Sequence, residues 1–427
     1  MRILVTGATG FVGRQIVEAL SNEGHDLVLT SRRGHKPDDR DNAPVWRTIE
    51  FAKAQSPSDW RDIVEDIDVV INAVGIFTPS GSQTFDALHD KAPRALFAAS
   101  QKAGVRRIIQ ISALGTDEQA TSPYHLSKKR VEDYLSGLEI QAVILRPSLI
   151  IGGEGESWRF FKALALLPVV PVIGDGAQPL QPVTINDVTR AVVVAIQSET
   201  AVGCRINLVG SETITHETYL QSLAIWMGRS KFRALYIPYA LAGHLAAIGW
   251  LFDKLPLNRS AVSMLKEARV YDGKDCETKF GFSPTDVSAF LRRNPPGHDE
   301  IVGARQYFLR GLLRLALSFM WIMAGIVSIF FHPQEQSLSL LASLGLTGVT
   351  GIVALYGAAL LDVLLGIGLL ARFHVRKLAL FQMGLITLYT LALTWAVPSL
   401  WFDPFGALAK NIPIIVATMT MMSWEKE

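Results

Sequence analysis

The chain opens with a short apolar run followed by three closely spaced glycines, MRILVTGATGFVG. Ile3–Val5 has the composition of a buried strand, and Gly7, Gly10 and Gly13 follow it directly. Because glycine has no Cβ, a strand can turn sharply here into a helix, which we expect over residues 11–20. The helix start offers free N–H groups and a positive dipole end to a diphosphate. The pattern predicts a dinucleotide cofactor at this turn; the alternative is a tight turn without a ligand.

Apolar runs and helical stretches then alternate through the first part of the chain. The expected strands are Asp26–Thr30, Asp68–Val74, Arg107–Ser112 and Gln141–Leu145, and the expected helices include Ala92–Ala103 and Pro123–Ser136. This alternation predicts an α/β domain with a Rossmann-type, doubly wound parallel sheet. Residues 154–176 and 204–296 interrupt the pattern, and we expect them to form a small substrate region within a domain spanning residues 1–300.

The residues at two strand ends indicate which cofactor is bound. The second strand ends in Thr30-Ser31-Arg32-Arg33 and lacks the carboxylate that would hold the ribose 2′-hydroxyl of NAD. Arg32 or Arg33 suits a 2′-phosphate instead, which favours NADP(H) over NAD(H); a solvated basic loop is the alternative. Asn72 and Ala73 end a later strand, where small residues let a cofactor pass close to the backbone or simply mark the strand end.

Three polar residues form the candidate catalytic group. Ser112 ends a strand, and Tyr124 and Lys128 lie four residues apart near the start of a helix, so both share one helix face. A tyrosine has a free pKa of about 10, and we expect the neighbouring ammonium and the helix N-terminus to lower it. Tyr124 would then exchange a proton with a substrate oxygen held by Ser112 during hydride transfer. A chance Y-x-x-x-K pair on a helix surface is the alternative.

These segments resemble a known superfamily. TGATGFVG, the serine-ended strand, YHLSK and LRPSLIIG are similar to the short-chain dehydrogenase/reductases. ISALGTD followed by SPYHLSKKRVE resembles their atypical branch, around the nucleotide-binding accessory subunit of respiratory complex I. The resemblance covers roughly residues 1–300.

The resemblance implies roles for particular residues. Gly7, Gly10 and Gly13 would hold the diphosphate, with Thr9 and Phe11 in the same turn. Lys128 would also touch the nicotinamide ribose, and Pro147 would lie beside the nicotinamide. The residues Thr184, Asn186 and Asp187 match a stretch that closes the site in extended members.

The C-terminal part has a different character and explains the mean hydropathy of +0.26. Four apolar runs of near-spanning length predict transmembrane helices at Tyr307–Phe331, Gly348–Ala371, Leu378–Val397 and Leu408–Met422. SFMWIMAGIVSIF, ALYGAALLDVLLGIGLL and WFDPFGALAKNIPIIV resemble the DoxX-like family, which implies a four-helix membrane domain over residues 303–427. The basic residues Arg305, Arg310, Arg314, Arg372, Arg376 and Lys377 predict an inner-membrane protein with its N-terminal domain and C-terminus in the cytoplasm.

Two further features bear on the membrane. Asp362 is the one acidic residue inside an apolar span, and its burial indicates either a function or a helix–helix hydrogen bond. Tyr236–Phe252 is almost wholly apolar apart from His244, and it predicts either an interfacial helix or a buried one.

The composition limits the possible functions. A net charge of +2 gives no indication of a nucleic-acid partner, and Cys204 and Cys276 lack metal-type spacing. The leading hypothesis is an NADP(H)-dependent oxidoreductase held on the lipid bilayer, with an apolar carbonyl, alcohol or quinone-like substrate. The alternative is a non-catalytic NADP(H)-binding assembly or sensor protein of a membrane complex. A sugar-nucleotide epimerase is a weaker third possibility.

Overall fold

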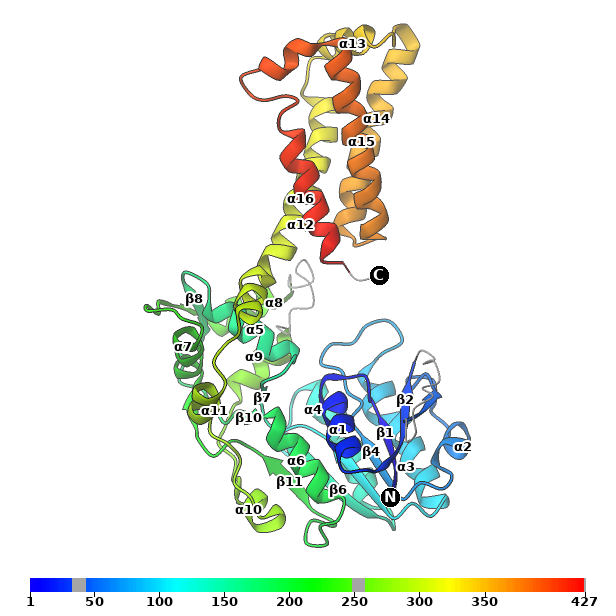
Figure 1. Ribbon diagram of the computed structural model, residues 1–427, viewed down its shortest axis with the longest axis vertical. Helices are drawn as coiled ribbons and strands as arrows, with labels where there is room; N and C mark the ends of the chain where they lie inside the picture. Colours follow the sequence, from blue (N-terminus) through cyan, green and yellow to red (C-terminus); the bar gives the residue numbers. More distant parts are fainter. Residues whose placement is uncertain (33–43, 248–257, 426–427) are drawn as a thin grey trace. The chain divides into compact units, whose positions relative to one another are not determined.

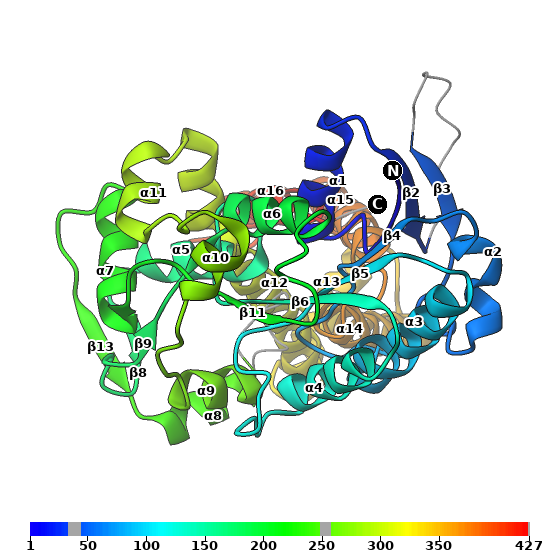
Figure 2. The ribbon, with the colours of Figure 1, turned by 90° about the horizontal axis from the view of Figure 1, so that it is seen from below.

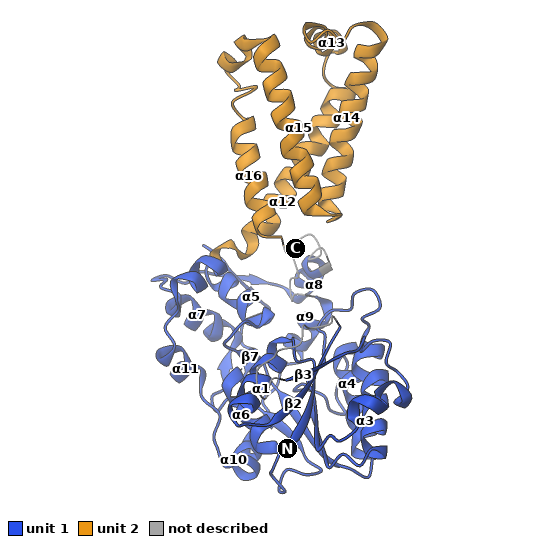
Figure 3. Cartoon of the chain, turned by 45° about the vertical axis from the view of Figure 1, so that its right-hand side comes forward, with its two compact units in different colours: residues 1–248, 255–304 blue, residues 249–254, 305–427 orange. Residues whose placement is uncertain are grey.

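The computed structural model describes residues 1–32, 44–247 and 258–425. The chain divides into two compact units (Figure 3). The first contains residues 1–248 and 255–304, and the second consists chiefly of residues 305–427.

A seven-stranded parallel sheet forms the centre of the first unit (Figure 1). In spatial order its strands are β11 (Arg205–Leu208), β6 (Gln141–Pro147), β5 (Arg107–Ile111), β4 (Val69–Asn72), β1 (Arg2–Thr6), β2 (Asp26–Ser31) and β3 (Val45–Thr48). The order reverses between β1 and β4, and the pairing of Thr6 with Asn72 puts their carboxyl ends side by side. Such a switch point is where doubly wound sheets bind ligands. The predicted Rossmann-type sheet is confirmed.

Helices pack on both faces of this sheet, as Figure 2 shows. One face carries α1 (Phe11–Asn22), α6 (Ile185–Ala195) and α10 (Lys274–Phe280), and the other carries η1 (Pro57–Trp60), α2 (Arg61–Val64), η2 (Asp86–Lys91), α3 (Ala92–Lys102) and α4 (Pro123–Ser136). Successive strand residues point to opposite faces. In β1, Ile3 and Val5 therefore join the first core and Leu4 joins the second, all fully buried.

One prediction about the sheet is wrong. We expected residues from Cys204 onward to interrupt the pattern, but Arg205–Leu208 forms the edge strand β11, parallel to β6. This four-residue strand alternates polar and apolar residues, and its apolar residues Ile206 and Leu208 pair with Leu145 and Pro147 of β6, which are buried. Such a segment is too short for its pattern to stand out in the sequence.

The rest of the first unit forms a smaller region with its own core. Its elements are β7 (Ile150–Ile151), α5 (Glu156–Ala165), β8 (Val170–Ile173), β9 (Pro179–Leu180), β10 (Val183–Thr184), β12 (Ile214–Thr215), α7 (His216–Trp226), β13 (Ala234–Ile237), α8 (Tyr239–Ala247), α9 (Arg259–Lys266) and α11 (Val287–Arg293). Trp158, Tyr219 and Leu223 are among its fully buried side chains. These residues pack α5 against α7.

The second unit is helical. It contains most of α12 (His298–Phe330), followed by α13 (Gln334–Ser343), α14 (Gly348–Leu370), α15 (Val375–Ala396), η4 (Pro398–Phe402) and α16 (Asn411–Ser423). Among the described residues, α12, α14 and α15 are long and apolar enough to cross a membrane. The fourth predicted span forms the 13-residue helix α16. At 1.5 Å per residue it is about 20 Å long, shorter than the roughly 30 Å hydrocarbon core.

Asp362 lies on α14 within this apolar unit. Its Oδ1 atom is buried without a hydrogen-bond partner in the described part of the chain. The helix–helix hydrogen bond that we considered for this carboxyl group is therefore not seen at that atom.

Candidate active site

The glycine turn is shaped by close backbone approaches. Gly7 has a φ of +73°, and a Cβ there would lie 2.8 Å from the carbonyl carbon of Ala73. A Cβ at Gly13 would lie 2.1 Å from the Gly7 carbonyl oxygen. Glycine is thus required for the turn to pass β4 and for α1 to start directly behind it.

The start of α1 remains available to a ligand. Thr9 and Gly10 are exposed, and none of the described side chains caps the helix at Gly10. Uncapped N–H groups at a helix N-terminus suit a diphosphate. The turn therefore fits the cofactor expected from the sequence.

Phe11 connects this turn to a loop that follows β7. A Cβ at Gly155 would lie 2.9 Å from the Phe11 ring, and one at Gly153 would lie 3.0 Å from it. One turn further along α1, Arg14 forms an exposed ion pair with Glu154 at 3.4 Å. The Phe11 side chain thus packs against the 153–155 loop, beside the turn that its backbone helps to form.

The remaining predicted cofactor residues lie at strand ends. Arg32 is exposed directly after β2, whereas Arg33 lies outside the described residues. Pro147 ends β6, and its carbonyl accepts a hydrogen bond from the Leu114 N–H at 2.9 Å. Ala73 lies against Gly7, as described above.

Asn72 occupies a different environment from the one predicted for it. Its fully buried amide accepts from the Thr6 hydroxyl at 2.6 Å and donates to Gln110 at 2.7 Å. The side chain thus joins the ends of β1, β4 and β5. Any contribution of Asn72 to cofactor binding in this arrangement comes through the position of the strands.

Helix α4 presents the candidate catalytic residues in one row. Pro123 at its first position and the Ser122 cap, whose hydroxyl accepts from the His125 N–H at 3.1 Å, start the helix just before Tyr124. Tyr124, Lys128 and Glu132 are spaced by four residues and therefore share a face. Our sequence analysis missed Glu132, although its spacing of four from Lys128 is a signal that could have revealed it.

Aromatic rings surround Tyr124. The rings of Phe77, Phe85 and His89 lie with their centroids 5.4, 5.9 and 5.5 Å from that of Tyr124, all in edge-on geometry. Burial raises the pKa of the Tyr124 phenol above its usual range. The lowering of this pKa that we expected is therefore not found, because burial disfavours the charged phenolate.

Lys128 lies beside Tyr124. Its Nζ atom is 5.7 Å from the tyrosine ring centroid and donates to the Ile111 carbonyl at 3.2 Å. Burial lowers the pKa of Lys128 to about 8, and the negative charge of Glu132 opposes this shift. A Cβ at Gly75 would lie 3.6 Å from Nζ, so this glycine leaves room next to the ammonium.

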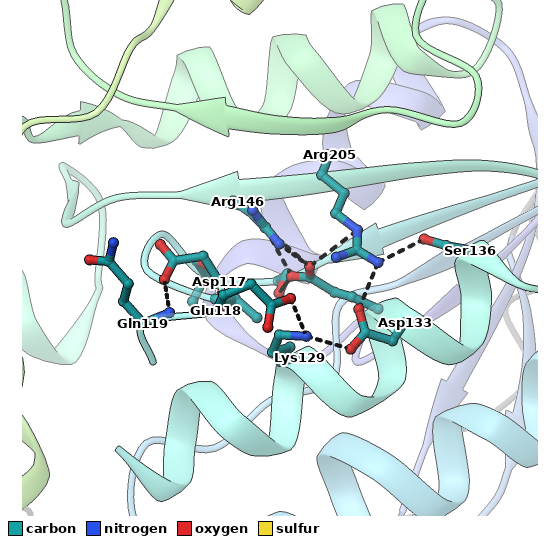
Figure 4. A network of polar contacts seen from close by, with 12 residues as sticks. Asp117, Glu118, Gln119, Lys129, Asp133, Ser136, Arg146 and Arg205 are labelled. Atoms are coloured by element: carbon teal, nitrogen blue, oxygen red, sulfur yellow. Dashed lines mark hydrogen bonds and ion pairs between the residues drawn. The ribbon is translucent and has the colours of Figure 1, made fainter. Parts of the chain in front are cut away.

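Ser112 contacts a buried carboxylate. Its hydroxyl donates to Glu132, which is fully buried and also accepts from Arg146 at 3.1 and 2.5 Å. Figure 4 shows Arg146 and Arg205 converging on this region, with Arg205 also bound to Asp133. The structure thus brings Tyr124 and Lys128 together, while the Ser112 hydroxyl is directed to Glu132.

His89 is a second residue that our sequence analysis missed. Its Nε2 accepts from the Ile76 N–H at 3.0 Å, so Nδ1 carries the proton and donates to the Ser127 hydroxyl at 3.0 Å. Ser127 in turn donates to the Tyr124 carbonyl at 2.7 Å. Burial, and then Lys128, lower the pKa of His89 to about 2, which keeps the ring neutral. His89 thereby ties the loop after β4 to the first turn of α4.

The stretch containing Thr184, Asn186 and Asp187, which the resemblance implies closes the site, forms the N-terminal cap and first turn of α6. Thr184 caps α6 by accepting from the Asp187 N–H at 3.0 Å, and its hydroxyl donates to the Asp187 carboxylate at 2.7 Å. Asp187 also accepts from the Thr285 N–H at 2.9 Å. These contacts connect α6 to the segment before α11.

Comparisons with known protein families agree with this architecture. Residues 3–208 match the NAD dependent epimerase/dehydratase family, and residues 318–419 match the DoxX-like family. The N-terminal domain is an NAD(P)-binding domain of the epimerase and short-chain dehydrogenase type. The chain joins it to a DoxX-like membrane domain, as the two sequence resemblances predicted.

Individual relatives are similar to the N-terminal part. NADH dehydrogenase (ubiquinone) 1 alpha subcomplex subunit 9 of Arabidopsis thaliana is 29% identical over 59% of this chain and 64% of its own length. The mouse protein of that name is 29% identical over 62% of this chain and 80% of its own length. A ceramide reductase of Caulobacter vibrioides is 30% identical over 40% of this chain and 53% of its own length. The chain thus spans less than two thirds of the plant and Caulobacter proteins.

Solved structures share the fold. A nucleoside-diphosphate-sugar epimerase from Staphylococcus aureus superposes with a TM-score of 0.56 at 17% identity, covering 68% of this chain and all of that chain. The UDP-glucuronic acid 4-epimerase of Bacillus cereus with bound NAD gives 0.51 at 21% identity, covering 72% of this chain and 97% of its own. At this level of identity the likeness extends to the fold alone.

We predict that Ser112→Ala destabilises the N-terminal domain. The change removes a hydrogen bond to a buried, charged carboxylate, and such bonds contribute about 1.5–3 kcal/mol. Thermal melting of the purified protein measures the effect, with Ser136→Ala as a control that removes a hydroxyl from the exposed contact with Arg205. Unchanged melting together with lost turnover would instead assign Ser112 to the substrate.

We also predict that Lys128→Met stabilises the ligand-free protein near pH 7 while it weakens cofactor binding. Burial shifts the pKa from 10.5 to about 8, which corresponds to a cost of about 3 kcal/mol. The unfolded chain holds more protons between these two pH values, so wild-type stability rises with pH there. The melting advantage of the variant should be full below pH 8 and shrink toward pH 10.

Lys129→Met is the matched control for this experiment. Lys129 pairs with Glu118 and Asp133 at 2.8 and 2.7 Å, so its loss should not raise the melting temperature. A Lys128→Met variant that melts below the wild type at pH 7 would contradict the prediction.

Proposed function

We propose that this protein is a membrane-anchored, NADP(H)-dependent oxidoreductase that interconverts a carbonyl and an alcohol on an apolar substrate. The observation that carries the proposal is the pair of Tyr124 and Lys128 on one face of α4, with Nζ 5.7 Å from the ring centroid. The uncapped glycine turn at the start of α1 supplies the cofactor site in the same domain. A proton donor and a dinucleotide site together suit hydride transfer.

The proposed reaction assigns a task to each residue. The bound nicotinamide supplies or accepts the hydride. In the reductive direction Tyr124 donates its phenolic proton to the substrate oxygen, so that hydride and proton together convert the carbonyl into an alcohol. The Lys128 ammonium stabilises the resulting phenolate and donates to the cofactor ribose. Ser112 would hold the substrate oxygen only when its hydroxyl turns away from Glu132.

Three observations favour an apolar substrate such as a lipid, isoprenoid or quinone-like carbonyl. The phenylalanine rings of Phe77 and Phe85 enclose the tyrosine. One relative is named a ceramide reductase, and a lipid carbonyl is consistent with that name. The DoxX-like domain keeps the enzyme at the bilayer, where such substrates dissolve.

The alternative function is a non-catalytic NADP(H)-binding assembly or sensor protein of a membrane complex. It is favoured by the similarity to the subunits named NADH dehydrogenase 1 alpha subcomplex subunit 9. Sugar-nucleotide epimerase chemistry is a weaker candidate, since Arg32 at the end of β2 does not suit the NAD that such enzymes hold. NADPH oxidation with a panel of long-chain ketones and quinones separates the enzyme from the assembly protein.

We further propose that the protein lies in the inner, cytoplasmic membrane, with the N-terminal domain and the C-terminus in the cytoplasm. Arg372, Arg376 and Lys377, at the turn between α14 and α15, and the arginines at 305, 310 and 314 support this orientation. This orientation requires a fourth crossing of the membrane, formed by α16 together with the residues that precede that helix.

We predict tighter binding of NADPH than of NADH, because Arg32 and Arg33 can pair with the 2′-phosphate. Replacing both by alanine should remove most of the preference, typically a factor of 10 to 100 in Kd. Fluorescence titration of the wild type and of the double variant with each cofactor measures it. Equal wild-type affinities would contradict the prediction.

We predict that Tyr124→Phe retains cofactor binding and lowers kcat by about 10²–10⁴-fold, since only the proton-transferring oxygen is lost. Cofactor titration and steady-state rates on one preparation measure both effects. Lys128→Ala should impair both. Full activity of Tyr124→Phe in a working assay would refute the proposed mechanism.

A further inference from the structure

Helix α8 exposes a row of apolar side chains. Its Ala242 and Ala246 are buried against Val262 of α9, together with Ile173 and Ile237. On another side of the same helix, Leu241 and Leu245 are 51% and 40% exposed. They are four residues apart and therefore lie together on the helix surface. The predicted segment Tyr236–Phe252 is thus partly buried and partly exposed, and its residues 248–252 lie outside the described residues.

Strand β13, which directly precedes α8, also exposes an apolar side chain. Ile237 packs in the same cluster as Ala242 and Ala246. Leu235, two residues earlier, shares the sheet face of Ile237 and is 56% exposed. We call the surface made by Leu235, Leu241 and Leu245 the α8 surface. Clustered exposed leucines on a folded domain indicate a contact surface.

Basic residues are frequent in the segments that form and flank α8. Residues 229–247 and 258–266 contain Arg229, Lys231, Arg233, Arg259 and Lys266 and neither aspartate nor glutamate. The Lys266 Nζ lies 5.9 Å from the ring of Tyr239, which begins α8. Lys231, Arg233 and Arg259 are exposed.

The nearby acidic groups are already engaged. Glu217 accepts a hydrogen bond from the Tyr236 hydroxyl at 3.0 Å, and Tyr236 lies on the opposite face of β13 from Leu235. Glu267 accepts from Thr121 and Ser263 at 2.7 and 2.8 Å. Asp175 accepts from the Ala177 N–H at 3.0 Å. These carboxylates keep their negative charge, and the exposed cations Lys231, Arg233, Arg259 and Lys266 of the same region offset it.

We infer that the α8 surface contacts the headgroup region of an anionic lipid bilayer. An apolar centre with lysine and arginine around it matches the chemistry of such a surface, where apolar side chains insert and cations meet lipid phosphates. The same chain carries three helices suited to crossing a membrane, so the domain is tethered near a bilayer at high effective concentration. The exposed His244 lies three residues after Leu241, and its Nδ1 donates to the Ala240 carbonyl at 2.7 Å.

Helix α9 links this surface to the loops around Tyr124. Asn258, its cap, donates to the Thr78 hydroxyl at 3.1 Å, next to Phe77. At its other end Glu267 binds Thr121, which precedes α4. Helix α9, which packs against α8, thus contacts the loops on two sides of Tyr124. The inference itself does not depend on the proposed reaction.

Depth-dependent fluorescence quenching tests the inference in the full-length protein. Cys204→Ser and Cys276→Ala provide a background in which Leu241→Cys or Leu245→Cys carries a polarity-sensitive fluorophore. The protein is placed in nanodiscs of phosphatidylcholine and phosphatidylglycerol, with or without brominated acyl chains. Lys102→Cys, exposed at the end of α3, is the matched control. Retained cofactor binding shows that each variant is folded.

We expect brominated lipid to quench the labels at 241 and 245 at least twofold more than the label at 102. Lys231→Glu with Arg233→Glu, or omission of phosphatidylglycerol, should halve that quenching or reduce it further. Quenching at 241 and 245 no greater than at 102 would overturn the inference, and would indicate contact with protein instead of lipid. Equal quenching in nanodiscs with and without phosphatidylglycerol would overturn the assignment to anionic lipid.

Discussion

The candidate active site depends on the buried ion pair between Glu132 and Arg146. A carboxylate without solvent is costly, and it is tolerated here because Arg146 donates to it through both Nε and Nη2 and the Ser112 hydroxyl also donates to it. Glu132 lies on α4, Ser112 follows β5, and Arg146 lies on β6. The pair therefore sets the position of α4 against the sheet, and with it the positions of Tyr124 and Lys128 two turns and one turn earlier.

Burial in this region shifts the pKa values of the candidate catalytic residues. Lys128 is held with little solvent, which lowers its pKa to about 8, while Glu132 opposes the loss of its charge. The Tyr124 phenol lies among aromatic rings, and burial raises its pKa, which disfavours the phenolate. His89, kept neutral by burial and by Lys128, holds the loop beside them without adding charge.

The second unit follows a different physical constraint. Its helices expose large apolar side chains such as Phe319, Val353 and Leu388, as expected of surfaces that face lipid. Helix α16 begins at Asn411 because residues 408–410 of the predicted span belong to the turn before it.

Much of this architecture was present in the sequence. Local signals determined the glycine turn, the alternating strands and helices, the limits of α4 and the apolar spans, because each depends on residues close together in the chain. Helix periodicity alone predicted that Tyr124 and Lys128 lie on one face of the helix.

The tertiary structure decided what long-range contacts control. The edge strand β11 forms through its pairing with β6. The side-chain amide of Asn72 is hydrogen-bonded to Thr6 and Gln110, which lie on two other strands. The Ser112 hydroxyl is directed to Glu132, and the pKa of Tyr124 is raised by burial in the folded chain. Sequence spacing places residues on a common face, but burial and partner choice depend on which segments pack against that face, and this requires the folded chain.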